Sequence, residues 1–193
     1  MNRKKLDRLL AVGGLAVTAL LVTAGALLTW AHVFVDHQVR SELASQKVYF
    51  PAKGSDALAS PEIGPYLDKY AGRQLLTGTQ AKAYADHFIA VHVNEIGGGQ
   101  TYAQLSAKAQ ANPSDEKLAQ TVQTVFRGET LRGLLLNAYA FSTMGYIAFI
   151  ASIVSFIGAG VMGLLSVLGF AHARSVDDQP NAPSAPAQEM IST

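Results

Sequence analysis

Two long apolar runs lie toward opposite ends of the chain. The first extends from Leu9 to Val35 and the second from Leu134 to Ala171, and the second contains no acidic or basic residue. Each is longer than the roughly 20 residues that a helix needs to cross a hydrocarbon core about 30 Å thick. The pattern predicts an all-α membrane protein in which two transmembrane helices flank a small helical extracytoplasmic domain.

The charge of the N-terminus predicts the orientation. Residues 1–8 contain four basic side chains and one acid: Arg3, Lys4, Lys5, Arg8 and Asp7. Basic flanks favour the cytoplasmic side, so a cytoplasmic N-terminus, 1–8, is expected. Two spans then return the tail, 172–193, to the cytoplasm, where its prolines and lack of periodicity predict disorder. A cleaved signal fits less well, because its apolar core covers only about 7–15 residues. The expected location is the cell (plasma) membrane, multi-pass, with both termini cytoplasmic.

The second apolar run is too long to lie entirely in lipid. As a helix, residues 134–171 would extend roughly 57 Å. Counting back from His172 places the outer edge of the span near Tyr146, and counting forward from Leu9 places that of the first span near Trp30. We therefore predict transmembrane helices at 9–30 and 146–171. The aromatic rings of Trp30 and Tyr146 would lie at the interface.

The region 31–145 is expected to be the extracytoplasmic helical domain, including extensions of both spans. Val35, Val39 and Leu43 form a four-residue repeat that predicts an amphipathic continuation of the first helix to near Lys47. The leucines at 134–136 need a partner outside the membrane. That repeat is the expected one, with a helix at 80–96 as a second layer.

Turn and cap residues divide the middle of the chain. We predict a short helix near 65–70, a helix at 80–96 capped by Thr77 or Thr79, and a third from Thr101 to about Ala109. The triple glycine 97–99 would end the second.

A further helix is expected to start at Asn112 and Pro113, which would serve as N-cap and first helical residue. No firm stop follows before the membrane. Gly128 and Gly133 each weaken a helix interior by about 1 kcal/mol, which leaves open whether this helix continues into the membrane.

Small residues form a candidate strip for helix packing on each span. Ala151, Ser155, Ala159 and Gly163 follow one another at four-residue intervals in the second span. In the first span the comparable strip contains Gly14, Thr18, Val22 and Ala26. Small residues let helix backbones approach closely in lipid. The strips could join the hairpin, mediate a dimer, or reflect only how common small residues are in spans.

Composition and motifs favour no catalytic chemistry. The net charge of +1 gives no nucleic-acid signal, and the absence of cysteine excludes disulfides and thiolate metal sites. The metal-ligand types nearest one another are His87, His92 and Glu95. His87 and His92 are five residues apart, about 140° around a regular α-helix, so they are weak metal candidates. No catalytic residue, cofactor or metal site is predicted.

Two arginines are candidates for contact with lipid phosphates. Arg127 and Arg132 precede the second apolar run, and guanidinium groups match phosphate geometry. The alternative is structural, because Glu129 and Arg132 are spaced to form an ion pair on a helix.

Three stretches resemble a known family: the Tyr70-Ala71-Gly72 turn, the cap region 97–105 and the block 126–141. The chain is similar there to a family of uncharacterised actinobacterial two-pass membrane proteins with an extracytoplasmic helical segment. Some similar proteins carry an automatic label of aromatic ring-opening dioxygenase. That chemistry requires iron held by two histidines and a carboxylate. The helical spacing of His87, His92 and Glu95 does not support the label, so the resemblance implies topology and no activity.

These observations predict a non-enzymatic integral membrane protein. Its helical domain would serve protein–protein interaction or act as an accessory subunit of an envelope complex. The alternative is an extracytoplasmic lipid or envelope-ligand binder, and a metal-dependent enzyme at His87, His92 and Glu95 is the least favoured hypothesis. The expected partners are the lipid bilayer and another protein or a second copy, with no nucleic acid.

Overall fold

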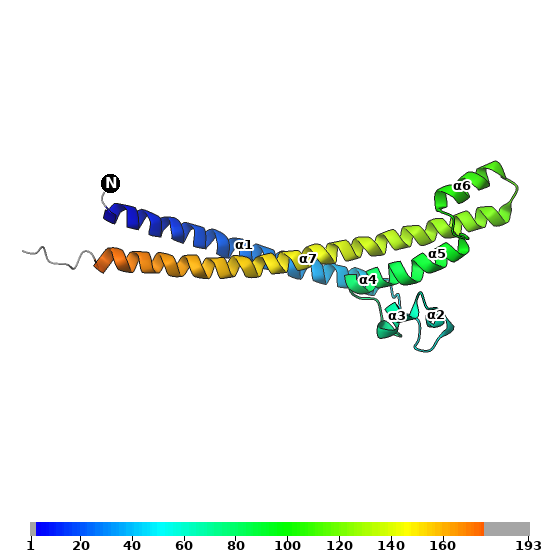
Figure 1. The fold of residues 1–193 in the computed structure, drawn as a ribbon, viewed down its shortest axis with the longest axis horizontal. Coiled ribbons are helices and arrows are strands. Elements are labelled where there is room, and N and C mark those ends of the chain that lie inside the picture. The colour runs from blue at the N-terminus through cyan, green and yellow to red at the C-terminus, as the bar shows by residue number, and fades with distance from the viewer. Residues whose placement is uncertain (1–2, 176–193) are drawn as a thin grey trace, which may run out of the picture. The chain divides into compact units, whose positions relative to one another are not determined.

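The computed structural model describes residues 3–175, which are all-helical with no strand among them, and helix makes up 82% of the structure. In chain order the helices (Figure 1) are α1 (Arg3–Ser45), α2 (Asp56–Ala59), α3 (Gly64–Leu67), the 3₁₀-helix η1 (Asp68–Tyr70), α4 (Gly78–Tyr84), the π-helix η2 (Ala85–Ile89), α5 (Ala90–Ile96), α6 (Tyr102–Ala111) and α7 (Glu116–Ser175). An isolated bridge pairs Tyr49 with Gln74. The predicted all-α class is confirmed.

Helices α1 and α7 are long and apolar enough to cross a membrane, as predicted. The most apolar windows have mean hydropathies of 2.1 and 2.2, yet only 17% and 11% of each window is buried within the chain. A core helix of a soluble protein would be mostly buried. The exposed apolar surface of these helices therefore fits a lipid environment.

The described chain forms two compact units. Unit 1 contains residues up to Leu27 and those from Ala151 onward, and unit 2 contains Leu28–Ile150. In unit 1, Ala11, Gly14 and Gly25 of α1 are buried, as are Ser152, Ala159 and Ser166 of α7. A side chain on Gly14 would clash with Ser166 Oγ, and one on Gly25 would meet the Phe156 ring at 2.9 Å. Small residues therefore bring these two segments together.

The packing strip in α1 differs from the expected one. Its less exposed positions alternate by three and four residues: Ala11, Gly14, Thr18, Leu21 and Gly25. Val22 of the predicted strip is 46% exposed. The physical reason is geometric: a step of four residues drifts about 40° around a helix, whereas alternating steps of three and four stay on one face.

The strip in α7 shows the same three–four alternation. Ser152, Ser155, Ala159, Met162 and Ser166 form its least exposed line. Ser155 and Ala159 of the expected strip lie on this line, while Ala151 and Gly163 are half-buried. A side chain on Gly163 would lie 3.5 Å from Thr18 of the same chain, so the strips join the hairpin.

The core of unit 2 joins α1 and α7 to α4, η2 and α5. Leu43 and Leu135 are buried in it together with Ala81, Ala85 and Val93. The predicted contact between the Val35/Val39/Leu43 repeat and the leucines at 134–136, with helix 80–96 as a second layer, is confirmed for Val39 and Leu43, which share a core with Leu135 and Leu136. Leu134 is the exception, because 61% of it is exposed.

Close approach of α1 to α7 in unit 2 occurs at Gly145. A side chain there would meet Val35 Cγ1 at 3.0 Å. The His32 ring lies with Nδ1 3.1 Å from the Gly145 carbonyl oxygen and packs 4.9 Å from the Phe149 ring. This polar contact between helices was not anticipated from the sequence.

The capping box predicted at Thr101 is confirmed, and of the two expected caps of the preceding helix, Thr77 and Thr79, it is Thr77 that serves and forms a second box. Thr77 caps α4 with Gln80, and Thr101 caps α6 with Gln104, each with side chain and backbone bonded reciprocally. The triple glycine ends α5 as predicted: Gly97 is its C-cap, and Gly98 and Gly99 take positive φ values of 58° and 74°.

The predicted start of the last helix at Asn112 and Pro113 is wrong. Asn112 ends α6 instead, with its side-chain amide donating to the Lys108 carbonyl. Helix α7 begins at Glu116, and the Leu118 N–H donates to Asp115 Oδ1 at 2.9 Å. Asp115 offers the same capping chemistry as Asn112 three residues later.

Helix α7 continues without a break through Gly128 and Gly133 to Ser175, which settles the continuity left open by the sequence. The first residues of the predicted disordered tail, 172–175, are therefore helical. Residues 176–193 lie outside the described part of the chain.

A cysteine pair tests the packing in unit 1. A Cβ on Gly14 would lie 3.4 Å from Ser166 Cβ, close to the roughly 3.5–4.5 Å that a disulfide requires. Because the chain has no cysteine, Gly14→Cys with Ser166→Cys should oxidise within one chain, seen as a mobility shift on a non-reducing gel. Gly13→Cys with Ser166→Cys is the control and should stay reduced, since nothing lies within 4 Å of Gly13. A cross-linked dimer in place of the intramolecular product would contradict this packing.

Two glycine substitutions should change stability in opposite directions. A Cβ on Gly78 would meet Ser142 Cβ at 2.3 Å and Tyr139 Cα at 3.1 Å. Gly78→Ala should therefore lower the free energy of unfolding by about 1–3 kcal/mol. Gly133 lies in α7 with nothing within 4 Å, so Gly133→Ala should raise it by about 0.5–1 kcal/mol. Thermal unfolding followed by circular dichroism measures both, and equal effects would argue against the α4–α7 contact.

Candidate functional site

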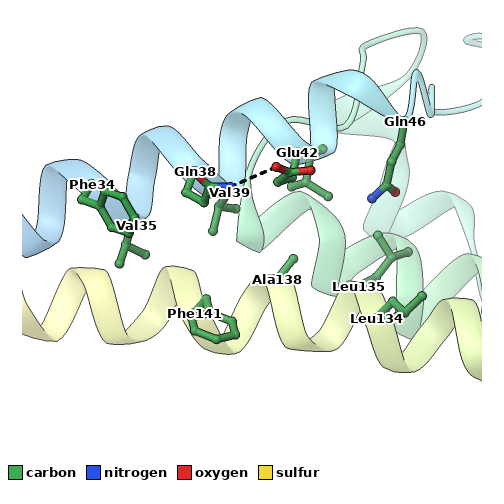
Figure 2. A pocket seen from close by; sticks show the side chains of 11 residues that line it. Phe34, Val35, Gln38, Val39, Glu42, Gln46, Leu134, Leu135, Ala138 and Phe141 are labelled. Carbon is green, nitrogen blue, oxygen red and sulfur yellow. Dashed lines mark hydrogen bonds between the residues drawn. The ribbon is translucent and has the colours of Figure 1, made fainter.

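An apolar groove of about 370 Å³ lies between α1 and α7 in unit 2 (Figure 2). Most of its lining is apolar, and apart from Gln46, which follows the last residue of α1, it comes from these two helices: Phe34, Val35, Gln38, Val39, Glu42, Leu43, Leu134, Leu135, Ala138 and Phe141. This volume is in the range of ligand and partner pockets. Other hollows of unit 2 are larger, but they have more polar linings, so the groove is the candidate site that its apolar lining singles out.

The helical period of α1 builds a polar edge on this groove. Gln38, Glu42 and Gln46 follow one another at four-residue intervals, one turn apart. Gln38 Nε2 donates to Glu42 Oε1 at 2.9 Å, which Figure 2 shows as a dashed line. Glu42 is the one ionised residue among those that line the groove. The groove therefore combines an apolar floor with an acidic edge.

Large apolar side chains on α7 form the opposite edge. Leu134 is mostly exposed and Phe141 is 56% exposed, although both belong to unit 2. Ala138 lies between them, one turn from each, and its small side chain leaves the space that the groove occupies. Exposed apolar side chains gathered around a hollow are typical of an interaction surface.

A different face of α7 is covered by α4 and its continuation. There, Gly78 lies against Tyr139 and Ser142, and Gly128 against Val93. Lys82 Nζ lies 5.3 Å from the centre of the Tyr139 ring. None of these α7 residues lines the groove, so the α1–α7 pair is covered on one face and hollow on another.

A charged cluster holds η2 against α7. Asp86 pairs with Lys82 at 2.5 Å and with Arg132 at 3.7 Å, and Arg132 also pairs with Glu129 at 3.4 Å. The hydrogen bond from Lys82 holds the pKa of Asp86 below its ordinary value and raises the pKa of Lys82. Burial raises the pKa of Tyr84 in the same helix run. These ion pairs hold η2 to α7 and so serve the fold, although the buried Nε of Arg132 has no hydrogen-bond partner among the described residues.

The structure changes the geometry around the metal candidates. Residues 85–89 form a π-helix, so the 140° separation of His87 and His92, which assumed a regular α-helix, does not apply. The His87 ring instead stacks on Tyr66 at 3.6 Å, whereas His92 Nδ1 lies 2.7 Å from the Phe88 carbonyl oxygen. Within residues 3–175 no three His, Asp or Glu side chains gather as metal ligands would, so Glu95 does not complete a site.

Continuity of α7 separates the candidate arginines from the predicted bilayer edge. Arg127 and Arg132 precede Tyr146 by 19 and 14 residues, which is roughly 28 Å and 21 Å along a helix. Arg132 is also engaged by Asp86 and Glu129. Contact of either guanidinium with lipid headgroups at that edge is therefore not supported.

The predicted interfacial aromatics are exposed. Trp30 and Tyr146 are both largely accessible, and the Trp30 ring stacks on Phe34 with centroids 5.6 Å apart. Phe34 also lines the groove, so the groove begins one helical turn beyond Trp30. In the sequence, the Val35/Val39/Leu43 repeat was the signal for this surface. The polar residues beside the repeat, Gln38 and Glu42, gave no indication of a groove.

An Asp86→Asn variant tests the charged cluster. Because the pKa of Asp86 is lowered on folding, its stabilising effect is present above its ordinary pKa of 3.8 and is lost as pH falls through the lower folded value. Asp86→Asn should lower the thermal midpoint by about 1–4 °C at pH 7, and the difference should shrink when the measurement is repeated at an acidic pH below 3.8. Glu62→Gln, at an exposed carboxyl group, is the control and should leave the midpoint unchanged at both pH values. A pH-independent loss in Asp86→Asn would mean that packing, not charge, is responsible.

The comparisons with known proteins add no relative: no protein-family model, no curated protein and no solved structure matches the chain. The resemblance to the actinobacterial two-pass family stays an expectation based on its three motifs, and the site has to be interpreted from its own geometry.

Proposed function

We propose that this chain is a non-enzymatic integral membrane protein whose helical unit serves protein–protein interaction, as an accessory subunit of an envelope complex. The observation that carries this proposal is the groove between α1 and α7, with large apolar side chains exposed around it. Exposed apolar surface of this kind costs free energy in water and is compensated when a partner covers it.

The proposed topology places the groove outside the cytoplasm. The basic N-terminus stays inside, residues 9–30 and 146–171 cross the membrane, and 31–145 form the extracytoplasmic domain. Two features support it. The apolar surfaces of α1 and α7 are exposed, and the two compact units meet at residues 27/28 and 150/151, near the proposed outer ends of the two spans. On this topology the groove begins just outside the bilayer.

The titratable side chains support a binding role over catalysis. Asp86 is held by Lys82 and Arg132, His87 stacks on Tyr66, and His92 contacts the Phe88 carbonyl. Each has a structural contact that accounts for its position. The alternative function is an extracytoplasmic binder of lipid or another envelope ligand, and the apolar lining of the groove is the observation in its favour.

A membrane-impermeant, amine-reactive cross-linker applied to intact cells tests both topology and function. Lys4 and Lys5 precede the first span. Six further lysines lie between the two spans: Lys47, Lys53, Lys69, Lys82, Lys108 and Lys117. We expect cross-links from the six to a second protein and none from Lys4 or Lys5, which are the internal control.

Mass spectrometry of the cross-linked peptides gives the readout. Reaction at Lys4 and Lys5 alone would contradict the topology. Links confined to this chain, together with a monodisperse monomer in mild detergent, would contradict the accessory-subunit function.

A further inference from the structure

We infer that the groove between α1 and α7 receives an apolar helix of a different protein, and that this helix carries a lysine or arginine facing Glu42. The inference rests on the proposed function and names the chemistry of the partner.

The register of α1 is the first reason for a helical occupant. His32, Val35 and Val39 are the partly buried positions toward α7, again separated by three and four residues. Phe34, Gln38 and Glu42 flank this line, as the residues beside the apolar seam of a coiled coil do. In helical bundles such flanking positions contact the next helix and determine which partner is accepted.

The length of the groove is the second reason. Its α1 edge extends from Phe34 to Leu43, which is roughly 13 Å or two and a half helical turns, and Gln46 prolongs it just past the end of α1. Phe141, Ala138 and Leu134 line the α7 edge at intervals of three and four residues. A small residue between two large ones accepts a side chain from a packed helix, in the way that helix ridges fit grooves.

The same unit already shows how a further helix packs on this pair. Helix α4 and its continuation lie on another face of α7, where Gly78 and Gly128 allow close contact. Those helices bury Ala81, Ala85 and Val93 in the core. The groove is the corresponding hollow that no described segment of unit 2 fills.

Charge decides between the possible occupants. Glu42 is the acidic residue of the lining, and no lysine or arginine lies among the lining residues. A symmetric contact with a second copy would present the same lining again, so it would bring no basic side chain from the groove to pair with Glu42. An anionic lipid headgroup would be repelled by Glu42, whereas a partner lysine or arginine would be attracted.

The test uses a photo-reactive benzoylphenylalanine in the full-length chain in native membranes. It is placed at Leu134 or Phe141, in the groove, and at Ala140 as a control, because Ala140 is exposed but does not line the groove. We expect adducts from Leu134 and Phe141 to an apolar, helix-forming segment of one other protein that contains a lysine or arginine. At least tenfold less adduct is expected from Ala140.

Charge reversal then tests Glu42 itself. Glu42→Lys should reduce the Phe141 adduct at least fivefold, and changing the partner's basic residue to glutamate should restore it. Asp36→Lys makes the same charge change on an exposed residue of α1 that does not line the groove, and it should leave the adduct unchanged. Circular dichroism of each variant confirms that the helices remain folded.

Each other outcome overturns the inference in a different way. Adducts between two copies of this chain would identify a homo-oligomer, and a lipid-mass adduct would identify an acyl chain. A protein adduct that is insensitive to Glu42→Lys would overturn the charge pairing. If groove adducts are absent while the lysine cross-links persist, the inference fails and the proposed function stands. If both are absent, the proposed function fails as well.

Discussion

Close packing of α1 against α7 is the contact on which both units depend. In unit 1 it requires small residues, because a side chain on Gly14 or Gly25 would clash with Ser166 or Phe156. In unit 2, Gly145 allows the approach of Val35, and His32 adds a polar contact to the Gly145 carbonyl. In both units the contacting positions alternate by three and four residues, as in helices that pack at a small crossing angle.

A pair of helices cannot enclose its own apolar surface. Unit 2 covers one face of the pair with α4, η2 and α5, and it secures them with capping boxes and with the charges at Asp86. The groove between Phe34 and Phe141 is the surface that this solution leaves open. The most distinctive candidate site is thus a consequence of how the core was built, which is why it contains few polar groups.

The π-helix of unit 2 positions side chains for packing and ion pairs within the fold. The π-helix at 85–89 shifts the helical register, and within this run Asp86 reaches Lys82 and Arg132 while His87 stacks on Tyr66. An extra residue in one turn re-aims every side chain that follows it. Regular helical angles applied to His87, His92 and Glu95 therefore described a geometry that this segment does not have.

The sequence alone determined the helical class, the two long apolar helices, the capping box at Thr101 and the glycine stop after α5. These features depend on local chemistry: the length of an apolar run, a hydroxyl three residues before an amide, or a residue that accepts positive φ. The start of α7 at Glu116 instead of Pro113 is also a local matter, since Asp115 and Asn112 offer the same capping chemistry. Tertiary structure decided the rest. It selected Leu21 and Gly25 over Val22 and Ala26, because only contact with another helix fixes which face is buried. It also carried α7 through Gly128, which packs against Val93, and formed the groove, because both outcomes depend on segments far apart in the chain.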